Sequence, residues 1–345
     1  MKSEILSLLF FLSVHLSLAQ GSISSELYKA KYAPSDADSS YILRYKRAND
    51  VRLIYGGVGT SLAFGSVREG NQLNTQLFNN VNDLIGVGLT YKFIDFDISY
   101  SLPKSAFLEE DRQNLKQFRL AMSYSTRQWS VRGFYQESQG MLSADAAGTF
   151  TSQPDIELKK TGAQLTYIFN QKKYSYRAAN YQTEHQQKMA GSFLLRIEPY
   201  YRNLKAPTGL VPEDKDLETT YGNQVGLQTV QAPGALLMPG YGINIPVIHN
   251  FFYISPILLA GPGVAYNNYV AEKGKFNEFN YEWSILAYLN FGYNGNKIYA
   301  NVRTAYEIYY VDLSPSYITT TDLRINLTIG YRFNNLENFI PESLF

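Results

Sequence analysis

Near the C-terminus, residues 321–333 (TDLRINLTIGYRF) alternate apolar and polar side chains without a break. Because successive side chains of a β-strand point to opposite faces, this run predicts one strand with an apolar face and a polar face. The apolar face carries Leu323, Ile325, Leu327, Ile329, Tyr331 and Phe333, and the other carries Asp322, Arg324, Asn326, Thr328, Gly330 and Arg332. A soluble sheet packs such an apolar face on a core, whereas a transmembrane strand turns it to lipid and carries aromatics at headgroup level.

Similar alternation recurs along most of the chain. Counting every strand-like run gives fourteen strands, or twelve if residues 221–230 and one other weak run are not strands. Gly56-Gly57, where the apolar parity changes, and Pro256 and Pro262 predict β-bulges. The runs are residues 51–64, 84–93, 95–102, 115–125, 129–136, 161–170, 174–181, 192–202, 221–230, 236–247, 251–266, 279–293, 298–310 and 321–333.

Composition favours a barrel and excludes several other classes. Aromatic residues make up 15% of the chain, with 29 Tyr and 20 Phe, which suits aromatic girdles at two membrane interfaces. After the first twenty residues no apolar run of about 18 appears, which excludes a helical membrane protein. The net charge of +1 gives no indication of nucleic-acid binding, and the absence of cysteine excludes disulfides and thiol chemistry.

The N-terminus carries an export signal. Lys2 is followed by an apolar run, residues 5–18, and Ser17-Leu18-Ala19 offers small residues for cleavage after Ala19. This predicts a signal peptide over residues 1–19; the alternative, a membrane anchor, is disfavoured because the run is short. We expect a periplasmic lead-in over residues 20–50, the barrel over residues 51–334 and a short periplasmic tail over residues 335–345.

These patterns predict an all-β protein that forms a closed antiparallel transmembrane β-barrel of 12–14 strands in a Gram-negative outer membrane. The alternative is a secreted β-sandwich or lipocalin-like fold. Short turns near residues 94, 127, 171, 249 and 295 alternate with longer loops such as residues 66–83 and 139–157, as periplasmic turns and extracellular loops do. The exception is the loop at residues 203–219, which this strand count places at the periplasmic end.

The polar strand faces predict the lining of the lumen. These charges can line a path for ions or solutes, or they can form a salt-bridge network that stiffens a narrow barrel. Interleaved signs favour the network, and the excess of arginine predicts a weak preference for anions. The candidates are Arg52, Asp95, Asp97, Arg119, Arg132, Arg177, Arg196, Glu198, Glu282, Arg303, Glu307, Asp322, Arg324 and Arg332.

No catalytic, metal or cofactor site is predicted. The mature chain has two histidines, His185 and His249, and neither lies on a strand beside a candidate nucleophile. Glu184 and His185 are adjacent, and adjacent residues rarely supply a complete metal site. We therefore expect a protein without enzymatic activity.

A motif in residues 173–201 (KYSYRAANYQTEHQQKMAGSFLLRIEPYY) resembles a family of Bacteroidota outer-membrane barrels catalogued as domain of unknown function 4421. Gln187 and Met189 depart from the family pattern. The resemblance extends over nearly all of residues 50–333, and similar pieces are residues 85–92, 239–241 and 330–333. It implies a barrel and no known activity. Residues 184–192 are interpreted as a structural loop closure in preference to a binding site. The matching residues are Lys173, Ser175, Glu184, Ala190, Gly191 and Ser192.

Two functions remain open. One is a narrow or gated channel or transporter for small solutes; the other is a structural or assembly component of a cell-envelope complex without transport. Barrels of about eight strands are filled by side chains and those of sixteen or more are open, so the luminal side chains decide at twelve to fourteen. The expected partners are outer-membrane lipid, the barrel-assembly machinery during insertion and, for the second function, an envelope protein; nucleic acid is not expected.

Overall fold

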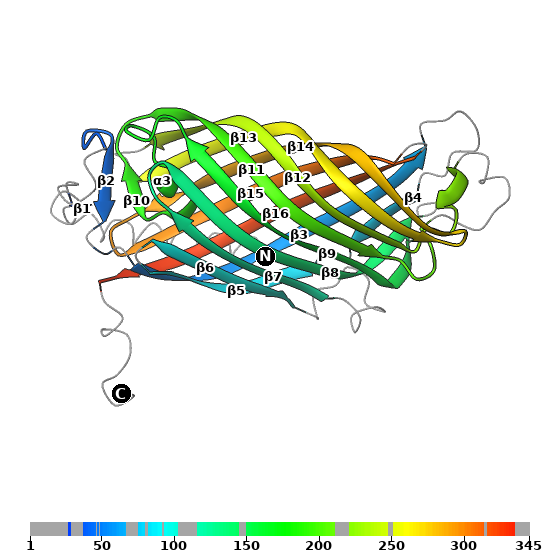
Figure 1. The fold of residues 1–345 in the computed structure, drawn as a ribbon. Coiled ribbons are helices and arrows are strands. Elements are labelled where there is room, and N and C mark those ends of the chain that lie inside the picture. The colour runs from blue at the N-terminus through cyan, green and yellow to red at the C-terminus, as the bar shows by residue number, and fades with distance from the viewer. Residues whose placement is uncertain are drawn as a thin grey trace, which may run out of the picture.

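The computed structural model describes residues 27–28, 37–45, 47, 49–66, 75–79, 82–91, 93–102, 116–144, 150–210, 221–247, 251–313 and 316–334. Within these ranges, twelve antiparallel strands close into one barrel (Figure 1). In ring order they are β3 (Asn49–Ser66), β5 (Asn82–Tyr91), β6 (Ile94–Ser101), β7 (Lys116–Ser125), β8 (Trp129–Ala144), β9 (Phe150–Ile168), β11 (Ala190–Lys205), β12 (Thr229–Val247), β13 (Phe252–Ala271), β14 (Gly274–Asn294), β15 (Ile298–Asp312) and β16 (Ser316–Phe333).

The ring closes between its last and first strands. β16 pairs with β3 along its whole length, from Phe333 opposite Asn49 to Ser316 opposite Ser66. β3 begins and β16 ends at the same end of the barrel, which we call the terminal end. The opposite end is the loop end. No helix among the described residues is long and apolar enough to cross a membrane.

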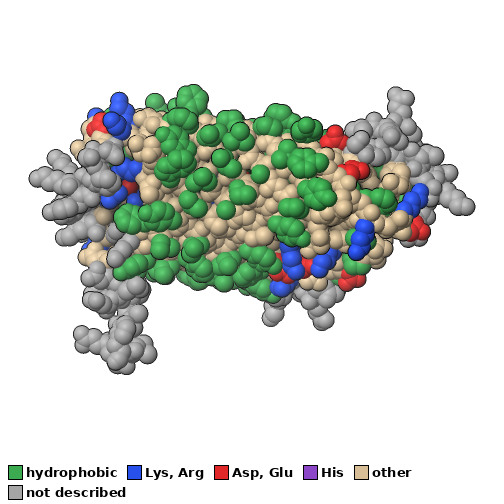
Figure 2. All heavy atoms as spheres, viewed as in Figure 1, with side chains coloured by type: hydrophobic (Ala, Val, Ile, Leu, Met, Phe, Trp, Pro, Cys, Tyr) green, Lys and Arg blue, Asp and Glu red, His purple; other side chains and the backbone are tan. Residues whose placement is uncertain are grey.

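The outer surface carries the apolar faces that the sequence predicts. Figure 2 shows a broad band of hydrophobic side chains across the visible face of the barrel, with charged side chains gathered toward its ends. On β14, Phe279, Tyr281 and Trp283 are 67%, 75% and 58% exposed. Residues 279–291 cover about 40 Å of strand, which a tilt of about 45° reduces to about 30 Å, close to the thickness of a bilayer core. The transmembrane barrel is confirmed, and the sandwich alternative is wrong.

The count of fourteen strands is too high by two. Residues 174–181 contain the helix α3 (Tyr176–Tyr181), because Ser175 caps it by accepting a hydrogen bond from the Ala178 amide at 2.9 Å. Residues 221–230 contain the 3₁₀ helix η3 (Gly222–Gln224) and only the first residues of β12. With one strand fewer before it, the connection between β11 and β12 lies at the loop end, so the exception at residues 203–219 disappears.

Two predicted loops contain strand. Most of residues 139–157 continues β8 and begins β9, with polar side chains because this part of the sheet rises above the apolar band. Residues 66–83 contain β4 (Thr75–Asn79), which pairs with both β3 and β8. β5, β6 and β7 are short. Beyond their ends, at the loop end, β4 lies between β3 and β8 (Figure 1).

The predicted bulges are also wrong. β3 keeps one register past Gly56 and Gly57 against both of its neighbours, and β13 does so past Pro256 and Pro262. The register shift lies instead between Gln139 and Met141, where Gly140 has a φ of 85°.

The parity change in β3 has another cause. Leu53 and Tyr55 point outward to lipid, whereas Val58, Leu62 and Phe64 point into the barrel and are buried. The strand stays regular while its apolar residues move from the outer face to the inner face. Leu62 and Phe64 join a cluster that fills the lumen at the loop end.

A charge placed on the lipid face near mid-membrane tests the position of this band. We expect Leu327→Arg, in the middle of the apolar face of β16, to lower the unfolding free energy in phospholipid bilayers by about 2–4 kcal/mol. Thr319→Arg, on the same face above the band, is the matched control and costs about 0–1 kcal/mol. Equal losses at the two positions, measured by denaturant titration, would contradict the placement of the band.

Candidate functional site

The terminal end of the lumen is closed by residues 174–189, which we call the plug. It contains α3 and the short strand β10 (Glu184–Gln186). Tyr174, Tyr176, Ala179 and Tyr181 pack on apolar inner-face residues of β11–β14, including Leu194, Met238 and Leu286. The plug therefore occupies the side of the lumen whose wall is apolar.

Polar side chains of the wall bind carbonyl groups of the plug. The Asn290 amide donates to Ala179 O at 2.8 Å, and the Arg303 guanidinium donates to Asn180 O and to Asn290 Oδ1. Arg332 donates to Gln182 O. These bonds satisfy carbonyls at the end of a six-residue helix and fix the plug to β14, β15 and β16.

The segment before the barrel covers the plug. β2 (Ile42–Tyr45) pairs with β10, with His185 opposite Leu43, and β1 (Leu27–Tyr28) pairs with the other edge of β2. The Tyr45 hydroxyl donates to Asn294 O at 2.7 Å, which connects this small sheet to the barrel wall. Part of the predicted lead-in thus forms an ordered sheet on the plug.

Glu184 is the centre of the plug. Its buried carboxylate accepts from Ser175 Oγ at 2.6 Å and lies within 3.6 Å of guanidinium nitrogens of Arg44, Arg127 and Arg177. Burial alone raises the pKa of Glu184, but Arg177 and Arg127 outweigh it and hold the pKa below its ordinary value. Arg177, predicted on a luminal strand face, lies on α3 and serves this cluster instead.

The remaining motif residues surround the ends of the plug. Ser192 Oγ accepts from the Asn170 amide at 2.8 Å, and Gly191 O accepts from the Asn170 side chain. Lys173 Nζ lies 5.2 Å from the centre of the Tyr41 ring, and Ala190 begins β11. These contacts give the motif a role in folding the plug.

His185 is buried among apolar and cationic neighbours. Because the Tyr45 hydroxyl proton is donated to Asn294 O, the 3.2 Å contact with His185 Nδ1 requires Nδ1–H to be the donor. Burial, with a smaller contribution from Arg332, lowers the pKa of His185 to about 4. His249 lies outside the described residues.

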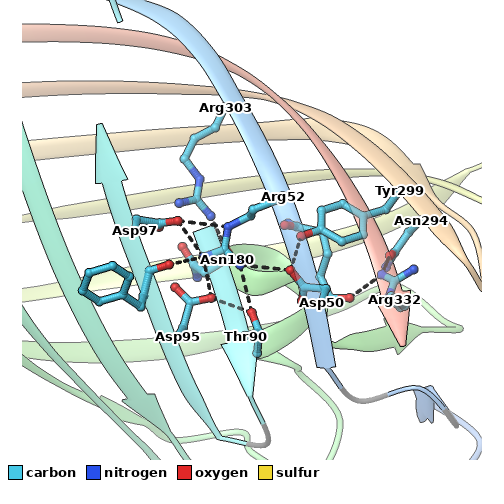
Figure 3. A network of polar contacts seen from close by, with 12 residues as sticks. Asp50, Arg52, Thr90, Asp95, Asp97, Asn180, Asn294, Tyr299, Arg303 and Arg332 are labelled. Carbon is cyan, nitrogen blue, oxygen red and sulfur yellow. Dashed lines mark hydrogen bonds and ion pairs between the residues drawn. The ribbon is translucent and has the colours of Figure 1, made fainter. Parts of the chain in front are cut away.

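A cluster at the terminal end gathers three carboxylates around one cation (Figure 3). The Arg52 guanidinium donates to Asp50 at 3.1 Å, to Asp95 at 2.7 Å and to Asp97 at 2.6 Å. Thr90 Oγ1 lies 2.8 Å from both Arg52 and Asp95, and the Tyr299 hydroxyl donates to Asp50 at 2.7 Å. This cluster joins β3, β5, β6 and β15 across the lumen wall.

A second network crosses the middle of the lumen. Lys160 Nζ lies 2.9 Å from Glu198 and 3.5 Å from Glu307, which also pairs with Arg324 at 3.1 Å. Glu282 pairs with Arg202 and accepts from the Tyr200 hydroxyl. The predicted lumen-lining residues do not include Lys160 or Arg202, although alternation places Arg202 on the polar face of residues 192–202. Lys160 lies just before a predicted strand, and alternation around Arg202 gave no sign of its partner.

The predicted lumen-lining residues, except Arg177, lie on inner faces of barrel strands. Asp322 accepts from Thr60 Oγ1 at 2.6 Å, and Arg196 donates to Tyr176 and Thr166. Arg119 and Arg132 face a cavity of about 110 Å³ between the plug and the charged wall. Within the described ranges, no group of three His, Asp or Glu side chains is placed to hold a metal ion.

The loop end is closed by an apolar layer. Tyr221, Val225 and Leu227 pack inside the barrel, and the Tyr221 ring stacks on Phe64 at 5.4 Å. Gln224 donates to Leu313 O at 2.8 Å and accepts from Ser316 Oγ, which attaches this segment to the end of β15 and the start of β16. The polar cavity therefore lies between two closures of different chemistry.

Comparison with known proteins identifies the family. The sequence profile described as Domain of unknown function (DUF4421) matches residues 36–333, which confirms the resemblance carried by Lys173, Ser175 and Glu184. None of the curated proteins compared with the chain matches it.

Solved structures with similar arrangements are barrels of several kinds. The outer membrane protease OmpT from Escherichia coli is 10% identical, over 83% of this chain and 96% of that chain, with a TM-score of 0.40. The P. putida toluene transporter TodX is 8% identical, over 83% and 90%, with a TM-score of 0.29. Ail, the attachment invasion locus protein of Yersinia pestis, is 9% identical, over 81% and 97%, with a TM-score of 0.21.

The Arg52 cluster predicts unequal costs for its members. Arg52→Gln leaves three neighbouring carboxylates without their cation and is expected to lower the unfolding free energy by about 3–5 kcal/mol. Asp97→Asn leaves two carboxylates on Arg52, and Asp97 is 27% exposed, so a loss below about 1 kcal/mol is expected. Urea unfolding at neutral pH measures both losses. A larger loss for Asp97→Asn than for Arg52→Gln would show that the carboxylates, and not the cation, determine the stability of the cluster.

His185 predicts a pH dependence. Since its pKa is about 4 in the folded chain and 6.5 ordinarily, the unfolded chain binds this proton more readily. The contribution is complete above pH 6.5 and declines as the pH falls toward 4, by about 3 kcal/mol at most. His185→Asn removes this component, so the unfolding free energy of wild type minus that of the variant, measured by urea titration, should fall steadily as the pH is lowered from 6.5 to 4. A pH-independent difference would refute the assignment.

Proposed function

Because the chain belongs to the DUF4421 family, whose description names no activity, we propose its function from the structure: a narrow, gated channel for small solutes. The supporting observation is the cavity between the plug and the charged wall, lined by inner-face side chains of β3, β5–β9, β15 and β16. A solute passes on the charged side of the lumen, where the plug has polar contacts and not apolar packing.

The two closures suggest how such a channel opens. At the terminal end, displacement of the plug from Arg303 and Asn290 breaks hydrogen bonds that water can replace. At the loop end, the cluster of Tyr221, Val225 and Leu227 excludes water and ions until it moves. The state described here is the closed one.

We place the channel in the outer membrane, with the terminal end facing the periplasm. The apolar band, the closed ring and the predicted signal peptide support this location. The partners in this proposal are outer-membrane lipid and the machinery that inserts barrels. The protein is not an enzyme in this proposal: among the described residues, the hydrogen bonds join His185 to Tyr45 and to no serine or threonine.

A second candidate is a structural component of an envelope complex. The observation that favours it is the number of bonds that fix the plug, together with the small sheet of β1, β2 and β10 at the terminal end. Such a sheet offers a folded surface to a periplasmic partner.

Planar-bilayer conductance of the purified barrel tests the channel. We expect rare openings for wild type and a several-fold higher open probability for Arg303→Ala, which loses its bond to Asn180 O. Glu307→Ala removes a luminal carboxylate and should shift ion preference toward anions.

The control is Lys205→Ala, on the outer surface, which should behave as wild type. No conductance in any variant, together with a stoichiometric partner in pull-downs from membranes, would replace the channel by the structural component.

A further inference from the structure

A second, smaller pocket adjoins the central cavity beneath the plug. It has a volume of about 10 Å³, and its cationic lining residues are Arg132, Arg196 and Arg303. The plug contributes Tyr176, Asn180 and Tyr181 to the same pocket, and none of the described residues that line it carries a carboxylate. Three positive charges thus meet at the contact between plug and wall.

None of the three guanidinium groups has an ion-pair partner among the described residues. Arg303 donates to the neutral oxygens of Asn290 and Asn180, and Arg196 donates to Thr166 and Tyr176. Arg132 has no hydrogen bond in the part of the chain that the structure describes. The nearby acid Glu198 is already bound to Lys160 at 2.9 Å and to Gln164 at 2.9 Å.

Arg196 carries the second observation. It is 2% exposed, its Cζ lies 5.7 Å from the centre of the Tyr288 ring, and among the described residues its Nη1 has no hydrogen-bond partner. A buried donor on a charged group that is left unpaired costs free energy, and native structures rarely keep one without a ligand or water. The unpaired nitrogen belongs to a residue that lines this pocket.

We propose that Arg132, Arg196 and Arg303 form a binding site for the anionic oxygen group of a small solute, a carboxylate or a phosphate. The planar guanidinium fork matches two oxygens of such a group, and the hydroxyls of Tyr176, Tyr181 and Ser130 add donors. The pocket itself accommodates one oxygen or one water, while the body of the solute occupies the adjoining cavity. Arg132 and Arg303 line both spaces.

The site rests on the proposed function, and it names the class of solute that the channel takes. It lies where a solute in the cavity reaches the plug, so a bound anion neutralises the wall groups that hold Asn180. Without a bound anion, the three guanidinium groups repel one another in a confined space.

Thermal unfolding of the full-length protein in detergent tests the site without requiring conduction. Sodium chloride sets the baseline at constant pH and sodium concentration, because chloride carries no oxygen atoms, and inorganic phosphate or acetate replaces it. We expect phosphate or acetate to raise the Tm of wild type, and the stronger of the two identifies the oxygen group. Arg132→Gln should need at least a tenfold higher concentration of phosphate or acetate for the same rise in Tm, and should itself raise the Tm in chloride.

Lys205→Gln, which removes a charge from the outer surface, is the matched control and should keep the wild-type response. Arg303→Gln is the second variant and should also weaken the response. Equal responses in Arg132→Gln and Lys205→Gln would overturn the site, and so would a wild-type Tm that does not rise when phosphate or acetate replaces chloride. Stabilisation by phosphate without any conductance would reject the channel and leave the site; conductance without stabilisation would do the reverse.

Discussion

The pairing of β16 with β3 is the constraint on which the structure depends. An unpaired strand edge in lipid leaves amide and carbonyl groups without partners, and only closure of the ring removes that cost. Closure turns one side-chain set of every strand to lipid and the other to the lumen. Leu327 and Ile325 therefore face outward because Asn326 and Arg324 must face inward. Because the outward residues must be apolar, the polar residues that alternate with them face the lumen.

Inside the ring, a buried charge lowers the stability of the fold unless it is paired. The two sides of the lumen wall meet this requirement in different ways. β11–β14 present Leu194, Met238 and Leu286, and the plug packs there. The opposite wall presents charges, which pair around Arg52 and around Glu307. Arg132, Arg196 and Arg303 lie at the boundary between these two walls, where plug and cavity meet. These three cations, which have no ion-pair partner among the described residues, thus lie where the proposed solute path meets the plug.

Alternation was sufficient to predict the barrel, the outward apolar faces and thirteen of the fourteen luminal charges, because these follow from a two-residue period and the need to bury or expose each face. It gave no pairing partners. Arg52 binds Asp95 and Asp97 through contacts between strands more than forty residues apart, and Lys160 meets Glu307 across the lumen. Such partners depend on the register and curvature of the closed ring.

The sequence by itself determined a membrane barrel with a charged lumen. A strand of thirteen alternating residues has one apolar and one polar face, and a barrel wall between lipid and a polar lumen suits both faces. Tertiary structure decided what fills that lumen. Residues 176–181 form α3 because Ser175 caps it and the wall binds its carbonyls, although the sequence of residues 174–181 also fits a short strand. Val58, Leu62 and Phe64 turn inward without any bulge because the loop end of the lumen is apolar, packed by Tyr221 from a distant segment. A local pattern records which residues are apolar, and only the closed ring decides whether lipid or another part of the chain covers them.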